Sequence, residues 1–185
     1  IHDESTLKLE NVGMNPSRTA ALHILQQMGA SVTLSNERMQ GREPVADMKI
    51  TSSPLNGIDI APALIPNCID ELPILMVALC FAEGQSTISG AEELRHKETD
   101  RLEAMYNILI AAGADAELKP DGITIQGNPG FVPKAAQFES QHDHRMAMAA
   151  AILSSVAEEP STILDAECTS ISYPQFWTHL QAVSK

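Results

Sequence analysis

Two ten-residue stretches of the chain share one pattern, and this pattern decides the fold that the sequence predicts. Residues 25–34 read LQQMGASVTL, and residues 109–118 read LIAAGADAEL. Each joins the end of an apolar helix, a Gly-Ala pair and an alternating strand, and glycine commonly ends a helix. A second match pairs residues 56–60 (NGIDI) with residues 121–125 (DGITI). We therefore expect duplicated units of helix, strand, turn and strand, although Gly-Ala is also a common helix stop on its own.

The rest of the chain alternates in the same way, which indicates an α/β protein. Strands are expected near residues 6–12, 32–34, 48–50, 58–60, 86–89, 116–118, 123–125 and 162–164, with Pro54 and Asn56-Gly57 as the turn between the third and fourth. Helices are expected after Asn15-Pro16-Ser17, after Asp70, after residues 95–101, from Asp143 or His144 to about Val156, and from near Tyr173-Pro174. The helix after Asp70 is apolar nearly all round, so it should be central.

Composition limits the possible functions. The chain has 185 residues, 44% of them apolar, and a net charge of −12. A length of this order suggests one domain or at most two small ones, and the acidic surface disfavours binding to nucleic acid or anionic membranes. The longest apolar run, Leu72 to Phe81, is too short to cross a bilayer. The first residues lack a methionine and run almost directly into a strand, so we expect a fragment of a longer protein.

The cysteines argue against zinc and thiol chemistry. Cys68, Cys80 and Cys168 are an odd number, and no two of them have C-x-x-C spacing. This pattern is typical of reduced, mostly buried thiols in a cytosolic protein. We therefore expect no structural metal and no cysteine nucleophile.

Charged residues gather where three apolar helices are expected to begin. The densest group is RHKETDR at residues 95–101, in which Lys97 and Arg101 are four apart and should share a face of the helix or of its leading turn. Cations are unfavourable at a helix N-terminus unless an anion is held there. A solvated surface cluster, in which Glu98 and Asp100 neutralise the cations, is the other interpretation, and charge alone favours it.

The second group is His142-Asp143-His144-Arg145, which precedes a strongly apolar helix. Metal binding by the two histidines is the weaker interpretation, and an anion-holding role for Arg145 is favoured. The third group is Asp70, which is either a simple N-cap or a general base near the cations. If the duplicated units pack in parallel, the three helix starts should converge on one site for a polyanion.

The motifs KETDRL and DHRMAM together resemble those of the 5-enolpyruvylshikimate-3-phosphate synthase family. Residues 15–32, 42–60 and 69–102 are also similar to that family, so the resemblance covers nearly all of the chain. It implies an α/β (α+β) fold of repeated βαβαββ units, with helices packed inside and sheets outside. It further implies that residues 1–185 form most of one of two domains, and that the other domain and the initial strand are absent.

The resemblance also implies a reaction and a set of roles. The family transfers the enolpyruvyl group of phosphoenolpyruvate to the 5-hydroxyl of shikimate 3-phosphate, in the cytoplasm, without a cofactor. By motif, Asp70 would bind the shikimate hydroxyls and act as the base, and Glu98 would shuttle a proton. The remaining implied substrate-binding residues are Lys97, Arg101, His144 and Arg145. The implied partners are the two substrates and the missing N-terminal part of the enzyme.

Two positions depart from the family pattern. Ile171 stands where many members have lysine, and Glu93 stands where many have asparagine. Two other functions stay open at this point: a non-catalytic scaffold or anion-binding module, and an enolpyruvyl transferase that acts on a UDP-sugar. The pair of charged motifs argues against the second.

Overall fold

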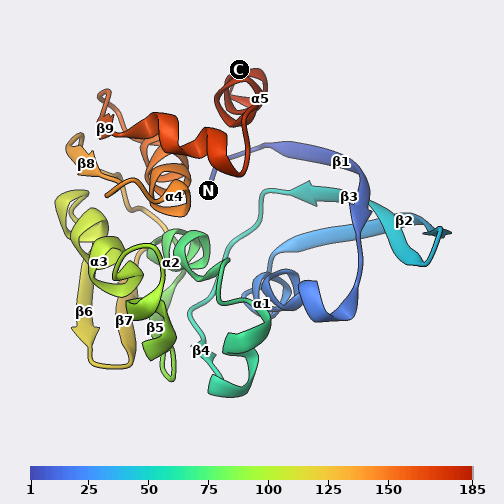
Figure 1. Cartoon of the computed structure of the whole chain (residues 1–185), viewed down its shortest axis with the longest axis horizontal. Coiled ribbons are helices and arrows are strands. Elements are labelled where there is room, and N and C mark those ends of the chain that lie inside the picture. Colours follow the sequence, from blue (N-terminus) through green and yellow to red (C-terminus); the bar gives the residue numbers. More distant parts are fainter. Residues whose placement is uncertain (185) are drawn as a thin grey trace.

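The computed structural model describes residues 1–184, which form three small sheets and a group of helices (Figure 1). The strands are β1 (Thr6–Gly13), β2 (Ser31–Gln40), β3 (Glu43–Thr51), β4 (Asp59–Ile60), β5 (Gly84–Ile88), β6 (Asp115–Lys119), β7 (Gly122–Gly127), β8 (Gln137–Glu139) and β9 (Thr162–Leu164). The α-helices are α1 (Ala20–Gln27), α2 (Leu72–Cys80), α3 (Arg101–Ala111), α4 (His144–Ser154) and α5 (Phe176–Val183). Short 3-10 helices are η1 (Pro16–Arg18), η2 (Pro62–Asn67), η3 (Glu92–His96) and η4 (Ala166–Ile171).

The middle of the chain is one complete βαβαββ unit. It runs β4, α2, β5, α3, β6, β7, and its sheet has the order β4-β5-β7-β6. The pair β4 and β5 is parallel, because α2 crosses between them, and β7 is antiparallel to both β5 and β6. The predicted fold class is therefore confirmed in this unit.

The two ends of the chain repeat parts of the same unit. The segment β1-α1-β2-β3 folds like β5-α3-β6-β7, and its sheet order β1-β3-β2 matches β5-β7-β6. The segment β8-α4-β9 repeats the parallel pair β4-α2-β5. At both predicted Gly-Ala stops the helix ends on a left-handed glycine, with φ of 101° at Gly29 and 86° at Gly113. The predicted duplication is confirmed.

The prediction that residues 56–60 and residues 121–125 are equivalent strands of the duplicated unit is wrong. Residues 121–125 continue the hairpin of β6 and β7, whereas Asn56 makes an isolated parallel bridge to Glu83 and β4 pairs with β5. The true counterpart of β7 is β3, which follows β2 through a turn at Gly41. The expected turn at Pro54 to Gly57 is instead a link between two different sheets. Alternating apolar residues mark a strand but do not identify its sheet.

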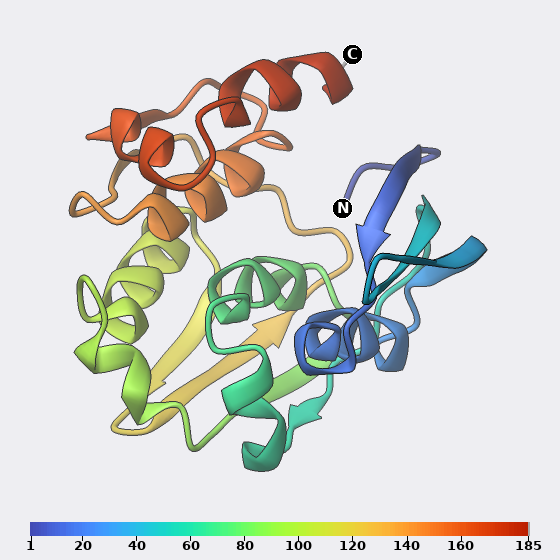
Figure 2. The ribbon, with the colours of Figure 1, turned by 45° about the vertical axis from the view of Figure 1, so that its right-hand side comes forward.

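The core lies among the helices. Seven of the nine residues of α2 are buried, which confirms that this apolar helix is central. It packs against α1, α3, α4 and strand β7. Figure 2 shows α2 between the four-stranded sheet and α4, with α5 on the far side of α4. Helix α2 thus occupies the interior with the four-stranded sheet on one side, whereas α5 lies at the surface and buries only Phe176.

The three-stranded sheet carries a matched pair of β-bulges around Asp47. The register of β3 shifts against β1 between Leu9 and Val12, and against β2 between Ser35 and Arg38. Each bulge contains a left-handed asparagine, with φ of 57° at Asn11 and 51° at Asn36. The Asp47 carboxylate accepts hydrogen bonds from the Asn11 backbone N–H at 3.0 Å and from the Asn36 amide at 2.8 Å. One carboxylate therefore holds both bulges.

Acid should loosen this sheet. The Asn11 N–H, the Asn36 amide and, more weakly, Arg38 lower the pKa of Asp47. A carboxylate with a lowered folded-state pKa stabilises the fold above its unfolded pKa of about 3.9, and this contribution is lost as the pH falls through the folded-state pKa. Asp47→Asn should lower the thermal unfolding midpoint at pH 7, and the difference from the parent chain should shrink below about pH 4. An equal deficit at pH 3 and pH 7 would contradict this account.

Candidate functional site

The candidate site is organised around a buried guanidinium. Arg101 is the first residue of α3, and its side chain is only 1% exposed. Its Nε donates to Asp143 Oδ2 at 2.7 Å, its Nη1 donates to Asp70 Oδ1 at 3.1 Å, and its Nη2 pairs with Glu98. Three carboxylates from three segments therefore meet one cation. Because a charge removed from water needs such partners, this arrangement holds the segments together.

A second guanidinium shares Asp70 with the first. Arg145 Nη2 lies 3.0 Å from Asp70 Oδ2, and its Nη1 donates to the backbone carbonyl of Asp70 at 2.9 Å. Asp70 thus sits between two arginines, one from α3 and one from α4. The starts of α2, α3 and α4 converge as expected, and the positive ends of their dipoles meet at one place.

Asp143 connects the two charged motifs. Its side chain is fully buried. One carboxylate oxygen caps α4 by accepting a hydrogen bond from the Arg145 backbone N–H at 2.8 Å, and the other accepts a hydrogen bond from Arg101 Nε. The preceding Gln141 and His142 are both left-handed, with φ of 53° and 59°, and a turn closes from the Asp143 N–H to the Ser140 carbonyl at 2.9 Å. This primed turn points Asp143 inward. The side chain of Gln141 also accepts a hydrogen bond from Thr99.

Lys97 and Glu98 lie in the bend at residues 97–99 that joins η3 to α3. Helix α3 begins at Arg101, with Asp100 as its N-cap, so Lys97 is not part of this helix, and a shared face of Lys97 and Arg101 on its leading turn stays a prediction. The Lys97 ammonium pairs with Glu93 at 2.6 Å. Glu98 is 55% exposed and reaches Arg101 from the solvent side. Lys97 therefore borders the arginine network without joining it.

Arg95 ties this segment to the hairpin of β6 and β7. Its Nη1 donates to Asp100 at 2.7 Å, and its Nε and Nη2 donate to the carbonyls of Pro120 and Lys119, each at 2.8 Å. The turn residue Asp121 in return accepts from the backbone N–H of Gly90 at 2.9 Å. Arg95 thus supports the segment that carries Lys97 and Glu98.

The histidines give no metal site in the described part of the chain. His144 is the half-buried first residue of α4, and among residues 1–184 its imidazole makes no hydrogen bond. His142 is exposed and lies 3.7 Å from Asp165. Among residues 1–184 no three His, Cys, Asp or Glu side chains gather as a metal would need. Within the same range no helix is long and apolar enough to span a membrane.

The cysteines are poor nucleophiles. All three are free and buried. Burial raises the pKa of Cys68 to about 11 and that of Cys80 to about 12, and it also raises the pKa of Cys168. A thiol must lose its proton to react, so none of the three is activated. This agrees with the expectation from their number and spacing.

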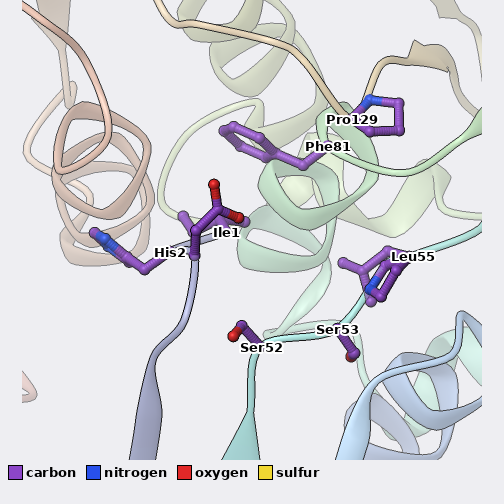
Figure 3. Close-up of a pocket in the computed structure, with 9 residues that line it drawn as sticks. Ile1, His2, Ser52, Ser53, Leu55, Phe81 and Pro129 are labelled. Carbon is purple, nitrogen blue, oxygen red and sulfur yellow. The ribbon is translucent and has the colours of Figure 1, made fainter.

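Two hollows differ in their relation to the charged network. One, of about 220 Å³, opens beside Asp70 and Arg145 and is otherwise lined mainly by apolar side chains, including Ile74, Met148 and Phe176. The other, of about 310 Å³, lies at the opposite end of α2 between Phe81, Pro129 and the first residues of the chain (Figure 3). Only the first adjoins the candidate site. Ile171, the residue that departs from the family pattern, is 75% exposed at the end of η4.

The roles of Asp70 and Asp143 differ from those predicted from the sequence. Asp70 is not a helix cap, because α2 starts at Leu72 after Glu71 and no side chain caps it. Asp143 was expected only as a possible helix start, although its carboxylate binds both the side chain of Arg101 and the backbone N–H of Arg145. Its position before an apolar helix was a signal for a cap, but the burial of Arg101 beside it could not be read from spacing.

Comparison with known proteins identifies the family of the chain. The family model for EPSP synthase (3-phosphoshikimate 1-carboxyvinyltransferase) matches residues 1–180. The chain belongs to the EPSP synthase family. A 3-phosphoshikimate 1-carboxyvinyltransferase of Salinibacter ruber is 50% identical over 98% of the chain, and one of Chloroflexus aurantiacus is 45% identical over the full length of the chain. The chain spans 42% of the length of each of these relatives.

A solved structure of the EPSP synthase family is also similar to this chain. An EPSP synthase from Acinetobacter baumannii matches 96% of the chain and is 39% identical, with a TM-score of 0.92, while the chain covers 41% of that structure. The enolpyruvyl transferase NikO from Streptomyces tendae matches 98% of the chain with a TM-score of 0.76 and 16% identity, which shows a shared fold alone. The match to a solved EPSP synthase thus agrees with the fold of the chain.

The buried ion pair of Arg101 and Asp143 should contribute strongly to the stability of the fold. Asp143→Asn keeps a capping side chain of nearly the same shape but removes a charge from beside buried Arg101, and should lower the free energy of unfolding by about 3 kcal/mol. The matched control is Asp100→Asn, at the cap of α3, where the carboxylate is part-exposed. It should cost about 1 kcal/mol or less. Chemical denaturation of both variants measures the difference, and equal losses would contradict a special role for Asp143.

Proposed function

We propose that the chain supplies one side of an active site that transfers the enolpyruvyl group of phosphoenolpyruvate to the 5-hydroxyl of shikimate 3-phosphate. The observation that carries this proposal is the Arg101–Asp70–Arg145 arrangement at three converging helix starts. Such a site offers a fixed carboxylate and cations within a few ångströms, as a reaction between a hydroxyl and a phosphorylated substrate requires. Membership of the EPSP synthase family favours this reaction over that of a UDP-sugar transferase or a scaffold.

Asp70 is suited to receive the substrate hydroxyl. Two guanidinium groups hold its carboxylate at 3.1 Å and 3.0 Å, so the side chain is oriented before a substrate arrives. In the addition step the 5-hydroxyl oxygen bonds to C2 of phosphoenolpyruvate, and the hydroxyl proton passes to a base. Asp70 is our candidate for this base.

Glu98 is suited to move the second proton. Addition converts the CH₂ of phosphoenolpyruvate to CH₃, and elimination of phosphate takes that proton away again. A group that both gives and receives a proton must exchange with solvent or with a neighbour, and Glu98 is half-exposed while Arg101 holds it. The overall transfer exchanges one C–O bond for another and involves no change of redox state.

The phosphate groups need more cations than this chain provides. The network joins Arg101 and Arg145 with the carboxylates of Asp70, Glu98 and Asp143, which is two positive charges against three negative ones, and the separate pair of Lys97 and Glu93 adds one charge of each sign. Both substrates are anions, so further cations must come from elsewhere. We infer that the remainder of the enzyme supplies them. In this proposal Arg101 acts mainly by orienting Asp70 and Glu98, while Lys97, Arg145 and His144 face the substrates.

The cellular setting that we propose is the cytoplasm. Three free, buried thiols fit a reducing compartment, where disulfides rarely persist. The proposed partners are the two substrates and the N-terminal part of the same enzyme.

The isolated chain should be inactive. Because its site has a net charge of about −1 by the count above, phosphoenolpyruvate should bind more weakly than about 1 mM, and no turnover should follow. Release of inorganic phosphate in the presence of both substrates, together with calorimetric titration of phosphoenolpyruvate, tests this. Phosphate release above the rate of a protein-free blank would refute the proposed division of the site.

In the full-length enzyme the two cations that face the substrates should be essential. Lys97→Ala and Arg145→Ala should each lower kcat/KM by roughly 100-fold or more, since each removes a charge that stabilises a phosphorylated transition state. Lys49→Ala, on the exposed three-stranded sheet, is the matched control and should leave kcat/KM unchanged. Near-normal rates in both site variants would exclude the proposed function for this site.

A further inference from the structure

The bend at residues 97–99 is closed by an ion pair between the residues on either side of it. Arg95, in the last turn of η3, lies before the bend, and Asp100 directly follows it. Nη1 of Arg95 lies 2.7 Å from Asp100 Oδ2, and both side chains are part-buried. The other carboxylate oxygen of Asp100 caps α3 by accepting a hydrogen bond from the backbone N–H of Glu103 at 3.0 Å. The two ends of the bend are therefore joined to each other and to the start of α3.

The same guanidinium fixes the bend to the four-stranded sheet. Nε and Nη2 of Arg95 donate to the carbonyls of Pro120 and Lys119, each at 2.8 Å, where β6 turns into β7. Because a guanidinium is planar, the angles between its donors are fixed. One side chain thus sets the distance between the bend and the turn of β6 and β7.

This turn is itself firmly held. The backbone N–H of Gly90 donates to Asp121 Oδ2 at 2.9 Å, and that of Ala91 donates to the Asp121 carbonyl at 2.7 Å. At the next residue there is no space for a side chain, because a Cβ on Gly122 would lie 1.9 Å from the carbonyl oxygen of Ile88. The turn is therefore a fixed reference point to which Arg95 connects the bend.

The bend carries two groups of the proposed active site, and their own ion pairs are local. The Lys97 ammonium pairs with Glu93 at 2.6 Å, and Glu98 pairs with Arg101. Glu93 belongs to the adjoining η3, and Arg101 begins the adjoining α3. Neither pair connects the bend to the sheet, so that connection depends on the bonds of Arg95.

We propose that Arg95 is a positioning residue, which sets Lys97 and Glu98 in place for the transfer reaction. This inference rests on the proposed function. Thr99 ties the bend to the turn before α4 through its hydrogen bond with Gln141, and Arg95 ties the bend to the sheet. Without the guanidinium the bend loses its fixed distance from the sheet. A displacement of about 1 Å at the reacting groups can cost a factor of about 100 in rate.

Steady-state kinetics of the full-length enzyme test this proposal. Arg95→Ala should lower kcat by about tenfold or more, while the KM for phosphoenolpyruvate changes by less than about threefold. This split is expected because Arg145 still faces the substrates, whereas proton transfer needs Glu98 in its place. Asp100→Asn should also lower kcat, and the double variant should be no slower than Arg95→Ala, because both changes remove the same ion pair. Losses that multiply in the double variant would contradict a joint action of the two residues.

Asp121→Ala is the matched control. It removes the other side-chain bond of the same turn, the one to Gly90, and leaves the contacts of the bend unchanged. It should lower the thermal unfolding midpoint but keep kcat within about twofold of the parent enzyme, when rates are measured well below the midpoint of each variant. Equal losses of kcat in Asp121→Ala and Arg95→Ala would show a general effect of loosening the turn and would overturn the positioning role.

The outcomes also separate this inference from the proposed function. A slow Lys97→Ala variant together with a normal Arg95→Ala variant would overturn the positioning role alone. Normal rates in both would overturn the proposed function and this inference with it. If Arg95→Ala does not fold, Arg95→Lys replaces it. A single ammonium on a flexible stem cannot reproduce the planar fork, so kcat should still fall by about threefold or more, and an unchanged kcat would refute the proposal.

Discussion

The burial of the Arg101 guanidinium is the constraint on which the rest of the site depends. Moving a charge of this size from water into the interior costs several kcal/mol, and neighbouring carboxylates must compensate for it. Asp70, Glu98 and Asp143 do so from three separate segments. Each of these segments precedes or begins a helix, so satisfying one cation also fixes where α2, α3 and α4 start. The charged residues are therefore part of the architecture of the domain core.

This constraint explains why the site is acidic although its substrates would be anions. A buried arginine needs carboxylates around it, and those carboxylates offset the cations that face the solvent side. The helix dipoles add only partial charges at the three N-termini. The described residues thus form a frame of ion pairs that holds Asp70 and Glu98, and in the proposed function further positive charge for phosphate comes from residues outside it.

Much of this arrangement could be predicted from the sequence, because the signals were local or periodic. The Gly-Ala stops, the central apolar helix and the charged helix starts are all where the patterns indicated. The failures concern partners in space. Asp70 looked like a cap because it precedes an apolar run, yet its partners Arg101 and Arg145 lie 31 and 75 residues away. The spacing of Lys97 and Arg101 likewise did not show that Lys97 pairs with Glu93 and that Arg101 pairs with Asp143.

The anchoring of Arg95 has a consequence for how this protein can vary. A two-residue turn at the tip of a hairpin is normally the safest place in a domain for an inserted peptide, a tag or a loop exchange. Here the turn of β6 and β7 is bonded through its carbonyls to Arg95 and through Asp121 to Gly90, and that segment carries Lys97 and Glu98. Lengthening the turn between β6 and β7 would therefore shift the segment that carries Lys97 and Glu98. Engineers should place insertions instead in the turn at Gly41, which has no such connection among the described hydrogen bonds.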